Sequence, residues 1–459
     1  TFWCQWSVIK NSLGQNSKQL NDVKIQINTS KSYSSIQLPG WFDRFIWILL
    51  TAGGSVVLLA VTNKMCQDVA VLPFLWVVPL CLYLFTFILC FERDAWYQRK
   101  IWFPFLALSV GLLVFLLHRE YEESQISLVY QIIIYCAALF GCCMVCHGEI
   151  VRRRPTTVDL TLFYVHIALG GALGGVFVNF IAPIAFGGYW ELHASLVFVC
   201  ALAMVVLVAL DQDEHQFHFS GIKFYVKRRF AVIVGCVGIG IMIWVLGKNI
   251  MVMQTPSIFN TRSFFGVLHV FEYDKGTREH YRILQHGRVS HGVQWMHTLD
   301  MDQPTAYYGS CSAAALALNR FPSRRSDDVE KNAIRVGAIG LGVGTIATYG
   351  RDNDVFRFYE INSDVDWVAR EYFTYLENSK ADIDVIIGDA RQTMKRELET
   401  TGSQQYDVIL VDAFNGDAIP THLLTQEASD LYWRHLKESG VLAFHISNNH
   451  FDLSDVVRQ

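Results

Sequence analysis

Two short stretches decide the fold of the C-terminal half of this chain: Ile334-Arg-Val-Gly-Ala-Ile-Gly-Leu-Gly-Val-Gly344 and Phe356-Arg-Phe-Tyr-Glu-Ile361. Each stretch begins with apolar and β-branched residues, a composition typical of a buried strand. The first stretch ends in three alternating glycines, and the second ends at a carboxylate. This order predicts a strand, a glycine turn, a helix that begins at the turn, and a second, parallel strand of an α/β sheet.

Three further strands are expected downstream, at 385–387, 406–411 and 441–446, with helices near 305–319, 363–377 and 425–437. Such alternation predicts a parallel, doubly wound sheet. Upstream, the strand-like runs 263–273 and 279–285 flank the turn signal Asp274-Lys275-Gly276, so a β-hairpin subdomain is expected over 257–300. The α/β domain itself is expected over 301–459.

Polar residues at the strand ends form a candidate site. A glycine turn lets backbone approach a ligand, so Gly340, Gly342 and Gly344 are candidates for such contact. Glu360 comes about 20 residues later, where a carboxylate can accept both hydroxyls of a ribose. Asp389 is placed to accept a hydrogen bond from an adenine amino group, and Asp412 faces the expected reacting centre. The alternative interpretation is that these are only turn and cap residues.

The N-terminal half has a different composition. The 459-residue chain is 52% apolar and only 17% charged, with a net charge of −4 and mean hydropathy of +0.26. These values exclude a disordered polymer and a nucleic-acid binder driven by positive charge. Seven apolar runs, mostly long enough to cross a bilayer, predict a polytopic helical membrane domain over 45–250 with lipid as its surroundings. The runs are 45–61, 69–91, 101–118, 126–146, 159–186, 191–210 and 230–247.

Basic residues alternate between the loops of this domain. They concentrate in the linker that ends at Arg44 and in the loops 92–100, 147–158 and 211–229. Because cytoplasmic loops carry the excess of Lys and Arg, these segments are expected on the cytoplasmic side. An odd number of crossings then places the soluble domain on the non-cytoplasmic side, unless the run 230–247 does not cross.

Two motifs in the apolar runs have structural interpretations. Gly170-Gly-Ala-Leu-Gly-Gly175 allows two helices to approach closely. Cys143-Met-Val-Cys-His147 spells a haem-attachment pattern on the wrong side of the membrane, so neither haem nor a metal is expected. Beyond His166 the runs contain almost no ionisable residue, and no ion relay is visible.

Residues 1–44 are interpreted as the end of an earlier helix and a polar linker.

At this point the chain resembles a known family. Its C-terminal half looks like spermidine synthases, aminopropyltransferases with a methyltransferase-like (Rossmann-like) sheet. The whole chain resembles their membrane-fused bacterial variety, which has a transporter-like (major-facilitator-like) helical half and resides in the inner membrane. The resemblance implies further helices upstream and a continuation of the sheet beyond Gln459. It is carried by Val71-Leu-Pro-Phe-Leu-Trp-Val-Val-Pro-Leu80, Met144-Val-Cys-His-Gly-Glu149, Tyr359-Glu360-Ile361 and Val411-Asp-Ala-Phe-Asn-Gly-Asp-Ala-Ile-Pro-Thr-His-Leu423.

The resemblance also implies roles for individual residues. The glycines, Glu360, Asp389 and Ala390 match positions that hold decarboxylated S-adenosylmethionine or its methylthioadenosine product. Asp412 matches the acid that helps to deprotonate the attacking amine, and Asp417 is placed to assist. Gln294, in a polar cluster with His286, His291 and His297, and Tyr308 are candidate contacts to the amine substrate. The alternative for the cluster is a set of polar β-hairpin residues.

Two departures from the family pattern weaken the implied activity. Val343 stands where the family's glycine loop usually carries an Asp that contacts the substrate. The family's acid-rich stretch that grips the polyamine corresponds only loosely to residues 302–310 here, and most of its acids are missing. Three hypotheses therefore stand: an aminopropyltransferase-like membrane enzyme, a catalytically inactive accessory subunit of a larger membrane complex, and a transporter with a domain that senses a nucleoside or polyamine.

Overall fold

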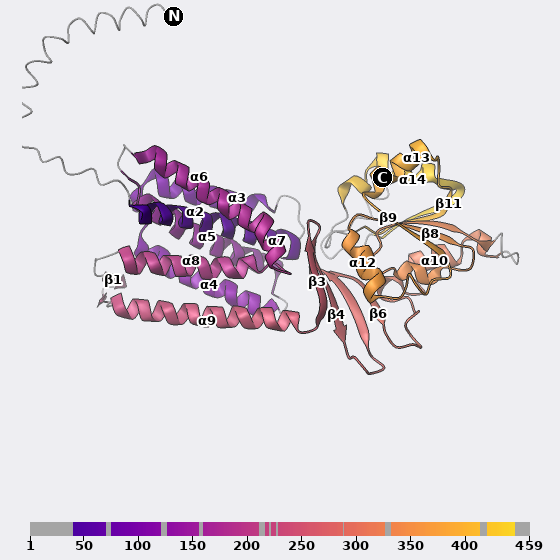
Figure 1. The fold of residues 1–459 in the computed structure, drawn as a ribbon, viewed down its shortest axis with the longest axis horizontal. Helices are drawn as coiled ribbons and strands as arrows, with labels where there is room; N and C mark the ends of the chain where they lie inside the picture. The colour runs from indigo at the N-terminus through magenta and orange to yellow at the C-terminus, as the bar shows by residue number, and fades with distance from the viewer. Residues whose placement is uncertain are drawn as a thin grey trace, which may run out of the picture.

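A computed structural model shows a bundle of helices followed by two sheets (Figure 1). The residues that it describes are 40–69, 75–120, 126–155, 159–210, 216–219, 222–225, 228–287, 289–325, 332–413 and 420–445. Most of the linker 1–44 and the candidate Asp417 therefore lie outside the described residues.

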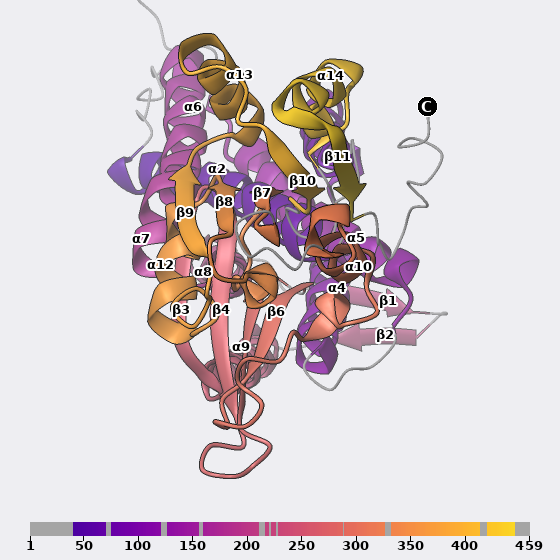
Figure 2. The same cartoon turned by 90° about the vertical axis from the view of Figure 1, so that its right-hand side faces the viewer.

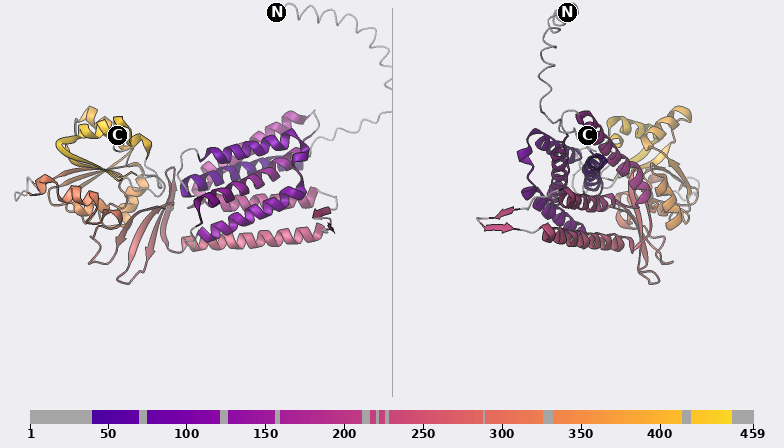
Figure 3. Two further views of the ribbon diagram at one scale, coloured as in Figure 1. Left: turned by 180° about the vertical axis from the view of Figure 1, so that it is seen from behind. Right: turned by 60° about the vertical axis from the view of Figure 1, so that its left-hand side comes forward.

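The helical half consists of long apolar helices that run roughly side by side along the length of the molecule (Figure 3). Within the described residues, six continuous helical stretches are long and apolar enough to cross a bilayer, by length and composition. The remaining predicted crossing, 69–91, corresponds to a helix of 16 residues, α3, which is shorter than a typical span. The helices are α2 (Trp41–Asn63), α3 (Val77–Glu92), α4 (Arg99–Glu120), α5 (Leu128–Arg152), α6 (Leu160–Val176), α7 (Ala182–Ala185), α8 (Glu191–Leu210) and α9 (Arg228–Gln254).

The glycine motif of α6 packs against α2. A Cβ on Gly170 would lie 2.0 Å from Thr51 Oγ1, and one on Gly174 would lie 2.8 Å from the Ala52 carbonyl oxygen. Any larger residue would push the two helices apart, so the small residues are needed for the close approach. By contrast, a Cβ on Gly175 would meet nothing within 4 Å. The predicted packing role is confirmed for Gly170 and Gly174.

An antiparallel sheet of four strands follows α9 directly. Its strands are β3 (Ser257–Ser263), β4 (Gly266–Tyr273), β5 (Tyr281–His286) and β6 (Val289–Trp295), paired in chain order. The expected turn between β4 and β5 is present, with Asp274 and Gly276 at positive φ. The predicted hairpin is thus only the centre of a four-stranded meander, because Gly266 also makes a tight turn, at φ +127°, between β3 and β4.

A parallel five-stranded sheet forms the C-terminal part. It contains β7 (Arg335–Ile339), β8 (Val355–Glu360), β9 (Asp382–Ile387), β10 (Tyr406–Val411) and β11 (Leu436–Phe444), in the spatial order β11-β10-β7-β8-β9. All four neighbouring pairs are parallel. This order, with the chain reversing direction across the sheet between β7 and β10, is consistent with a methyltransferase-like fold.

Helices cover both faces of this sheet, as a doubly wound fold requires (Figure 2). On one side, α10 (Ala313–Asn319) and α12 (Ser363–Tyr372) pack against a core that includes Phe356 and Phe358. On the other, α13 (Ala390–Thr400) and α14 (Gln426–His435) pack against a core that includes Tyr359. The alternation along β8 reflects the two-residue repeat of a strand.

Three helix predictions are wrong in extent. The helix expected over 363–377 ends at Tyr372, because Phe373 adopts an extended conformation. The helix expected over 305–319 begins only at α10, because Gly309 interrupts the segment and the Ser312 side chain caps the helix by accepting a hydrogen bond from Ala315 N at 3.1 Å. The helix expected directly after the glycine turn is only a 3-10 helix, η7 (Thr345–Tyr349). The glycine turn therefore does not point the N-terminus of a long α-helix toward a ligand.

Candidate functional site at the carboxyl edge of the parallel sheet

The ends of four parallel strands meet at one edge, where the predicted residues gather. Gly340 N donates to Tyr359 O at 2.9 Å, Gly388 N to Glu360 O at 2.8 Å, and Asp412 N to Ile339 O at 2.8 Å. The ladder thus continues one residue beyond each strand and holds these strand ends next to one another. Ligands of open α/β sheets bind at this edge, at the point where the strand order reverses, which here lies between β7 and β10.

The glycine loop is shaped by contacts with the protein itself. Gly340, Gly342 and Gly344 all have positive φ, at +99°, +57° and +83°. A Cβ on Gly340 would lie 2.2 Å from the backbone oxygen of Asp412, and one on Gly342 would lie 2.7 Å from that of His291. The first of these contacts brings the loop directly against the end of β10. The predicted glycines are therefore required, at least by the packing of the loop.

Glu360 joins the glycine loop to the start of α12. Its Oε2 accepts a hydrogen bond from Leu341 N at 3.0 Å, and its Oε1 accepts one from Asn362 N at 2.9 Å. The residue is buried, and burial raises the pKa of Glu360 while the backbone hydrogen bonds oppose that shift. Each carboxylate oxygen retains a second lone pair, so the group can still accept from a hydroxyl.

Asp389 serves as a helix cap at the end of β9. Its Oδ1 accepts from Gln392 N at 2.8 Å, and its Oδ2 lies 2.8 Å from His422 Nε2. The next residue, Ala390, is buried as the first residue of α13. The structure thus places both predicted residues at the expected edge, while it gives the Asp389 side chain local partners from two segments.

Asp412 is the most unusual group at this edge. Its Oδ2 accepts a hydrogen bond from the Tyr308 hydroxyl. Its Oδ1 is shielded from solvent and has no hydrogen-bond partner among the described residues. Burial of the carboxylate raises its pKa to about 7, and the neighbouring hydroxyls of Tyr308 and Tyr307 act against the shift. A carboxyl group with a pKa near neutrality is suited to taking up and releasing a proton.

A small cavity of about 60 Å³ lies beside Asp412. Its volume suits a few water molecules and is well below the roughly 300 Å³ of a typical ligand pocket. The neighbouring segments 414–419 and 446–459 lie outside the described residues. The cavity is lined by Tyr307, Tyr308, Ser312, Ala313, Ala314, Leu410, Val411, Asp412, Ala443, Phe444 and His445.

The sequence analysis missed two of these side chains, Tyr307 and His445. Their rings lie 4.3 Å apart between centroids, and burial raises the pKa of Tyr307 and lowers that of His445. Tyr307 adjoins the predicted Tyr308, and His445 directly follows β11, near the end of the strand expected at 441–446. Strand-end position, the signal that singled out Asp412, could have identified His445.

Gln294 has a buried, fully bonded side chain. Its Nε2 donates to Met301 O at 2.9 Å and to Thr374 Oγ1 at 2.7 Å, while its Oε1 accepts from Thr374 N at 3.0 Å. It lines neither of the two described pockets. Of the predicted substrate contacts, the structure brings Tyr308 to Asp412 and uses Gln294 to tie β6 to the loop after α12.

The rest of the polar cluster is also engaged in packing. His286 Nε2 lies 2.7 Å from Phe265 O, and burial lowers the pKa of His291 to about 3. Val343, at the family's substrate-contacting position, is buried against Gly292, where an added Cβ would lie 2.3 Å from a Val343 methyl group. The tip of the glycine loop is therefore covered by β6.

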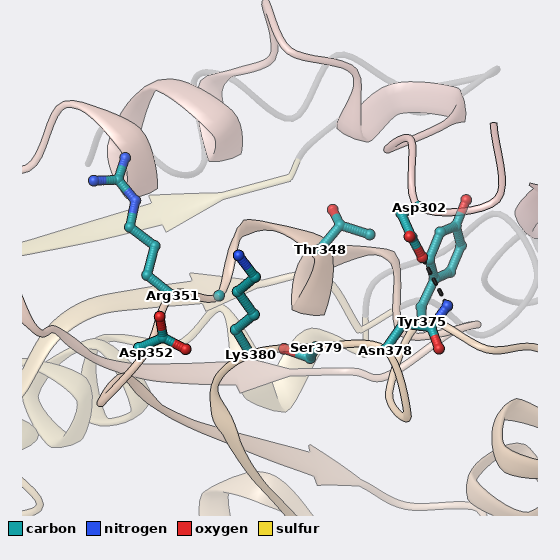
Figure 4. A pocket seen from close by; sticks show the side chains of 9 residues that line it. Asp302, Thr348, Arg351, Asp352, Tyr375, Asn378, Ser379 and Lys380 are labelled. Atoms are coloured by element: carbon teal, nitrogen blue, oxygen red, sulfur yellow. Dashed lines mark hydrogen bonds between the residues drawn. The ribbon is translucent and has the colours of Figure 1, made fainter. Parts of the chain in front are cut away.

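A second pocket, of about 410 Å³, lies elsewhere (Figure 4). Its residues come from the segments that precede β8 and β9 and from the loop after β6, so it is at the amino edge of the sheet, opposite Asp412. Its charged side chains are Arg351, Lys380, Asp302 and Asp352. Asp302 Oδ1 accepts a hydrogen bond from Asn378 Nδ2 at 2.7 Å. A polar pocket on this edge is separate from the predicted site.

In the helical half, the Cys143–His147 motif and the residues beside it are packing elements. The Cys143, Cys146 and His147 side chains are buried, and His147 Nδ1 lies 3.0 Å from Thr86 Oγ1. Glu149 is fully buried and accepts from Arg99 Nε at 2.6 Å and from the Tyr97 hydroxyl at 2.8 Å. Across the described residues, no group of His, Cys, Asp and Glu is arranged to hold a metal ion.

No family model matches the chain. Over 111 residues it is 35% identical to a polyamine aminopropyltransferase of Vibrio vulnificus, which is 24% of this chain and 36% of that protein. Over 126 residues it is 33% identical to an N-terminal histidine N-methyltransferase of Emericella nidulans, which is 27% of this chain and 21% of that protein. The chain thus matches about a third of the length of the first curated relative and a fifth of the second.

Among solved structures, the spermidine synthase of Thermotoga maritima superposes with a TM-score of 0.31 and 15% sequence identity, covering 44% of this chain and 61% of that one. A superposition this loose carries no argument. The sequence matches, in contrast, show distant homology to an aminopropyltransferase and a methyltransferase. The predicted resemblance is therefore supported at that level, while the membrane-fused variety is not addressed by these comparisons.

Proposed function

We propose that this protein is a membrane-anchored group transferase. Its soluble half transfers an aminopropyl-type group from decarboxylated S-adenosylmethionine, or a related nucleoside sulfonium, to an amine. The observation that carries the proposal is Asp412, a shielded carboxylate with one unpartnered oxygen and a pKa raised to about 7, at the strand end where such sheets bind their ligands. The distant homology to an aminopropyltransferase supports the same reaction class.

Asp412 supplies the step that an amine acceptor needs. An alkylamine is protonated near pH 7 and becomes a nucleophile only after it loses that proton. Asp412 accepts the proton, the nitrogen lone pair forms a new C–N bond, and the C–S bond breaks with its electron pair returning to sulfur as the thioether leaves. The Tyr308 hydroxyl holds the carboxylate through Oδ2, which leaves the unpartnered Oδ1 to face the amine.

The nucleoside is assigned to the neighbouring strand ends. Glu360 retains lone pairs for ribose hydroxyls, and the glycine loop that it holds approaches from β7. Ile361, directly after Glu360, is 46% exposed and offers an apolar surface to a purine ring. Asp389, at the end of the next strand, is half-buried. It accepts a hydrogen bond from the adenine amino group once His422 has moved away from its carboxylate.

The helical half is proposed to sit in a bilayer as a multi-pass domain, in a bacterial inner membrane by the resemblance. Its outer faces are apolar, with Phe180 at 68% and Trp244 at 67% exposed. The basic loops after α3 and α5 lie at the end of the bundle away from the sheets (Figure 1). The excess of positive charge on cytoplasmic loops favours a non-cytoplasmic soluble half, whereas a donor made in the cytoplasm requires that half to face the cytoplasm. The orientation therefore decides between group transfer and an inactive accessory subunit.

Cysteine labelling tests this orientation. Cys311 is exposed and is the single cysteine after residue 240. A membrane-impermeant maleimide added to intact spheroplasts is expected to label the wild-type protein and not the Cys311→Ser variant. Labelling that appears only after the membrane is permeabilised would place the soluble half in the cytoplasm.

The transfer reaction itself is tested by product analysis. The solubilised protein, given decarboxylated S-adenosylmethionine and a panel of diamines, is expected to release methylthioadenosine, as measured by mass spectrometry. Asp412→Asn removes the proton acceptor with little change in shape, so it is expected to abolish release while nucleoside binding persists. Turnover in Asp412→Asn at the wild-type rate would contradict the assigned role.

A second function is favoured by one set of contacts. The loop tip at Val343 lies under β6, and the cavity beside Asp412 holds only about 60 Å³. A site closed in this way suits a catalytically inactive accessory subunit of a membrane complex. Absence of nucleoside binding at millimolar concentration, together with co-purification in stoichiometric amounts with another membrane subunit, would favour this function over transfer.

A further inference from the structure

Strand β3 stands between the helical half and the α/β part (Figure 1). Only Thr255 and Pro256 separate it from the end of α9. Side chains of a strand alternate between its two faces, so successive residues of β3 can reach opposite neighbours. Asn260 and Arg262 contact the helical half, whereas Phe259 and Thr261 contact α12.

On the helical side, Arg262 makes an unusually complete set of contacts. Its Nη1 and Nη2 each donate to Glu191, the first residue of α8, at 2.8 Å. Nη1 also donates to Gly188 O at 2.9 Å, and the guanidinium lies 4.7 Å from the centre of the Tyr189 ring. The side chains of Arg262 and Glu191 are 5% and 0% exposed. A buried bidentate pair of this kind fixes the relative position of the two elements.

On the other side, β3 is attached to the first and last turns of α12. The Thr261 hydroxyl donates to Asp364 Oδ2 at 3.2 Å. The Phe259 ring lies 4.8 Å from that of Trp367 and 5.3 Å from that of Tyr372. A displacement of β3 must therefore either move α12 or break these contacts.

The start of α12 is bonded to the candidate nucleoside site. Asp364 N donates to Asn362 Oδ1 at 3.1 Å, and Asn362 N donates to Glu360 Oε1 at 2.9 Å. The other oxygen of Glu360 accepts from Leu341 N in the glycine loop. An unbroken series of hydrogen bonds thus runs from α12 to the loop between β7 and η7.

We propose that Arg262 is a positioning residue for the nucleoside site, through which the helical half holds Glu360 and the glycine loop in place. This assignment rests on the proposed function for the identity of the ligand. The mechanical link itself, from Glu191 through β3 and α12 to Leu341, rests on the contacts alone. A change in the α7–α8 end of the bundle would then alter the order of the site, and ligand binding would in turn restrain that end of the bundle.

Hydrogen exchange of the solubilised full chain tests the link without any ligand. In Arg262→Gln, the backbone amides of Leu341 and Asn362 are expected to exchange at least fivefold faster than in wild type. Thr261→Val keeps the side-chain shape, removes only the hydroxyl, and is expected to act in the same direction. Lys275→Gln is the matched control, because Lys275 lies on the same sheet in an exposed pair with Glu272.

Three outcomes decide the matter. Faster exchange at both amides in both variants, with the control unchanged, supports the proposal; if Arg262→Gln fails to fold, Thr261→Val alone decides. Wild-type exchange in Thr261→Val overturns the link. Loss of protection spread evenly over the whole chain also overturns it, because it would show a purely structural role.

A binding experiment then connects the link to the ligand. The dissociation constant for methylthioadenosine, measured by calorimetry, is expected to rise about fivefold or more in Thr261→Val. An unchanged constant in a wild-type protein that does bind overturns the positioning role. If the wild type does not bind methylthioadenosine at all, the proposed function fails while the exchange experiment still judges the mechanical link.

Discussion

Ionisation of Asp412 should make the protein less stable as the pH rises. Its pKa is raised from 3.8 to about 7, so between these values the folded protein keeps a proton that the unfolded chain has released. Stability is therefore fully present below about pH 4 and is lost as the pH rises through 7. A shift of about three pH units, at 1.36 kcal/mol each, corresponds to a loss on the order of 4 kcal/mol.

Asp412→Asn removes this dependence because the amide cannot ionise. The variant keeps the shape of the side chain and an oxygen that can accept from the Tyr308 hydroxyl. We expect it to melt at a higher temperature than wild type above pH 7, with a difference that grows between about pH 4 and pH 7 and then levels off. For a soluble part of this size, 1 kcal/mol shifts the melting temperature by roughly 2–4 °C.

Scanning calorimetry of the solubilised wild type and variant across pH 5 to 9 measures the effect. Asp352→Asn, at an exposed carboxylate on the opposite edge of the sheet, is the control and should give a curve parallel to that of wild type. Parallel curves for Asp412→Asn and wild type would refute the reasoning, because they would show that the Asp412 carboxylate titrates at its ordinary pKa.

Two further predictions concern the frame of the site. Gly344→Ala should destabilise the protein by about 1–3 kcal/mol more than Gly402→Ala; both glycines have φ +83°, but only at Gly344 would the Cβ strike a neighbour, Leu376 Cδ2, at 2.7 Å. Equal losses in thermal unfolding would show that packing of the glycine loop is not the constraint. Arg324→Met should cost about 3–5 kcal/mol, because it leaves the buried Asp354 without its bidentate partner. A melting temperature within a degree of wild type would contradict that estimate.

The succession of parallel strands along the chain could be predicted because its signals are local. Each strand is a short apolar run, and four of the five end at a glycine or a carboxylate, so Gly340, Glu360 and Asp412 were correctly expected at one edge. Helix lengths were predicted less well. The helical composition of 305–319 does not reveal that Gly309 interrupts that segment. Nor does the sequence after the glycine turn reveal that η7 is only a short 3-10 helix.

Long-range contacts could not be predicted at all. Gln294 was expected at a substrate because it lies in a polar cluster, yet its partner Thr374 is 80 residues away. The buried pairing of Arg262 with Glu191 joins segments 71 residues apart, and neither segment contains a sequence signal that predicts contact with the other. In the helical half, the structure buries Glu149 beside Arg99, although the two residues were expected in separate loops, 147–158 and 92–100.

The most direct test of the central claim is calorimetric titration of the solubilised protein with methylthioadenosine, with Glu360→Ala as the comparison. The account predicts binding by the wild type and at least a tenfold weaker affinity in the variant, since Glu360 both holds the glycine loop and faces the ribose. Glu371→Ala, on the exposed face of α12, should bind like wild type. Equal affinity of wild type and Glu360→Ala, or no binding by the wild type at millimolar ligand, would contradict the claim.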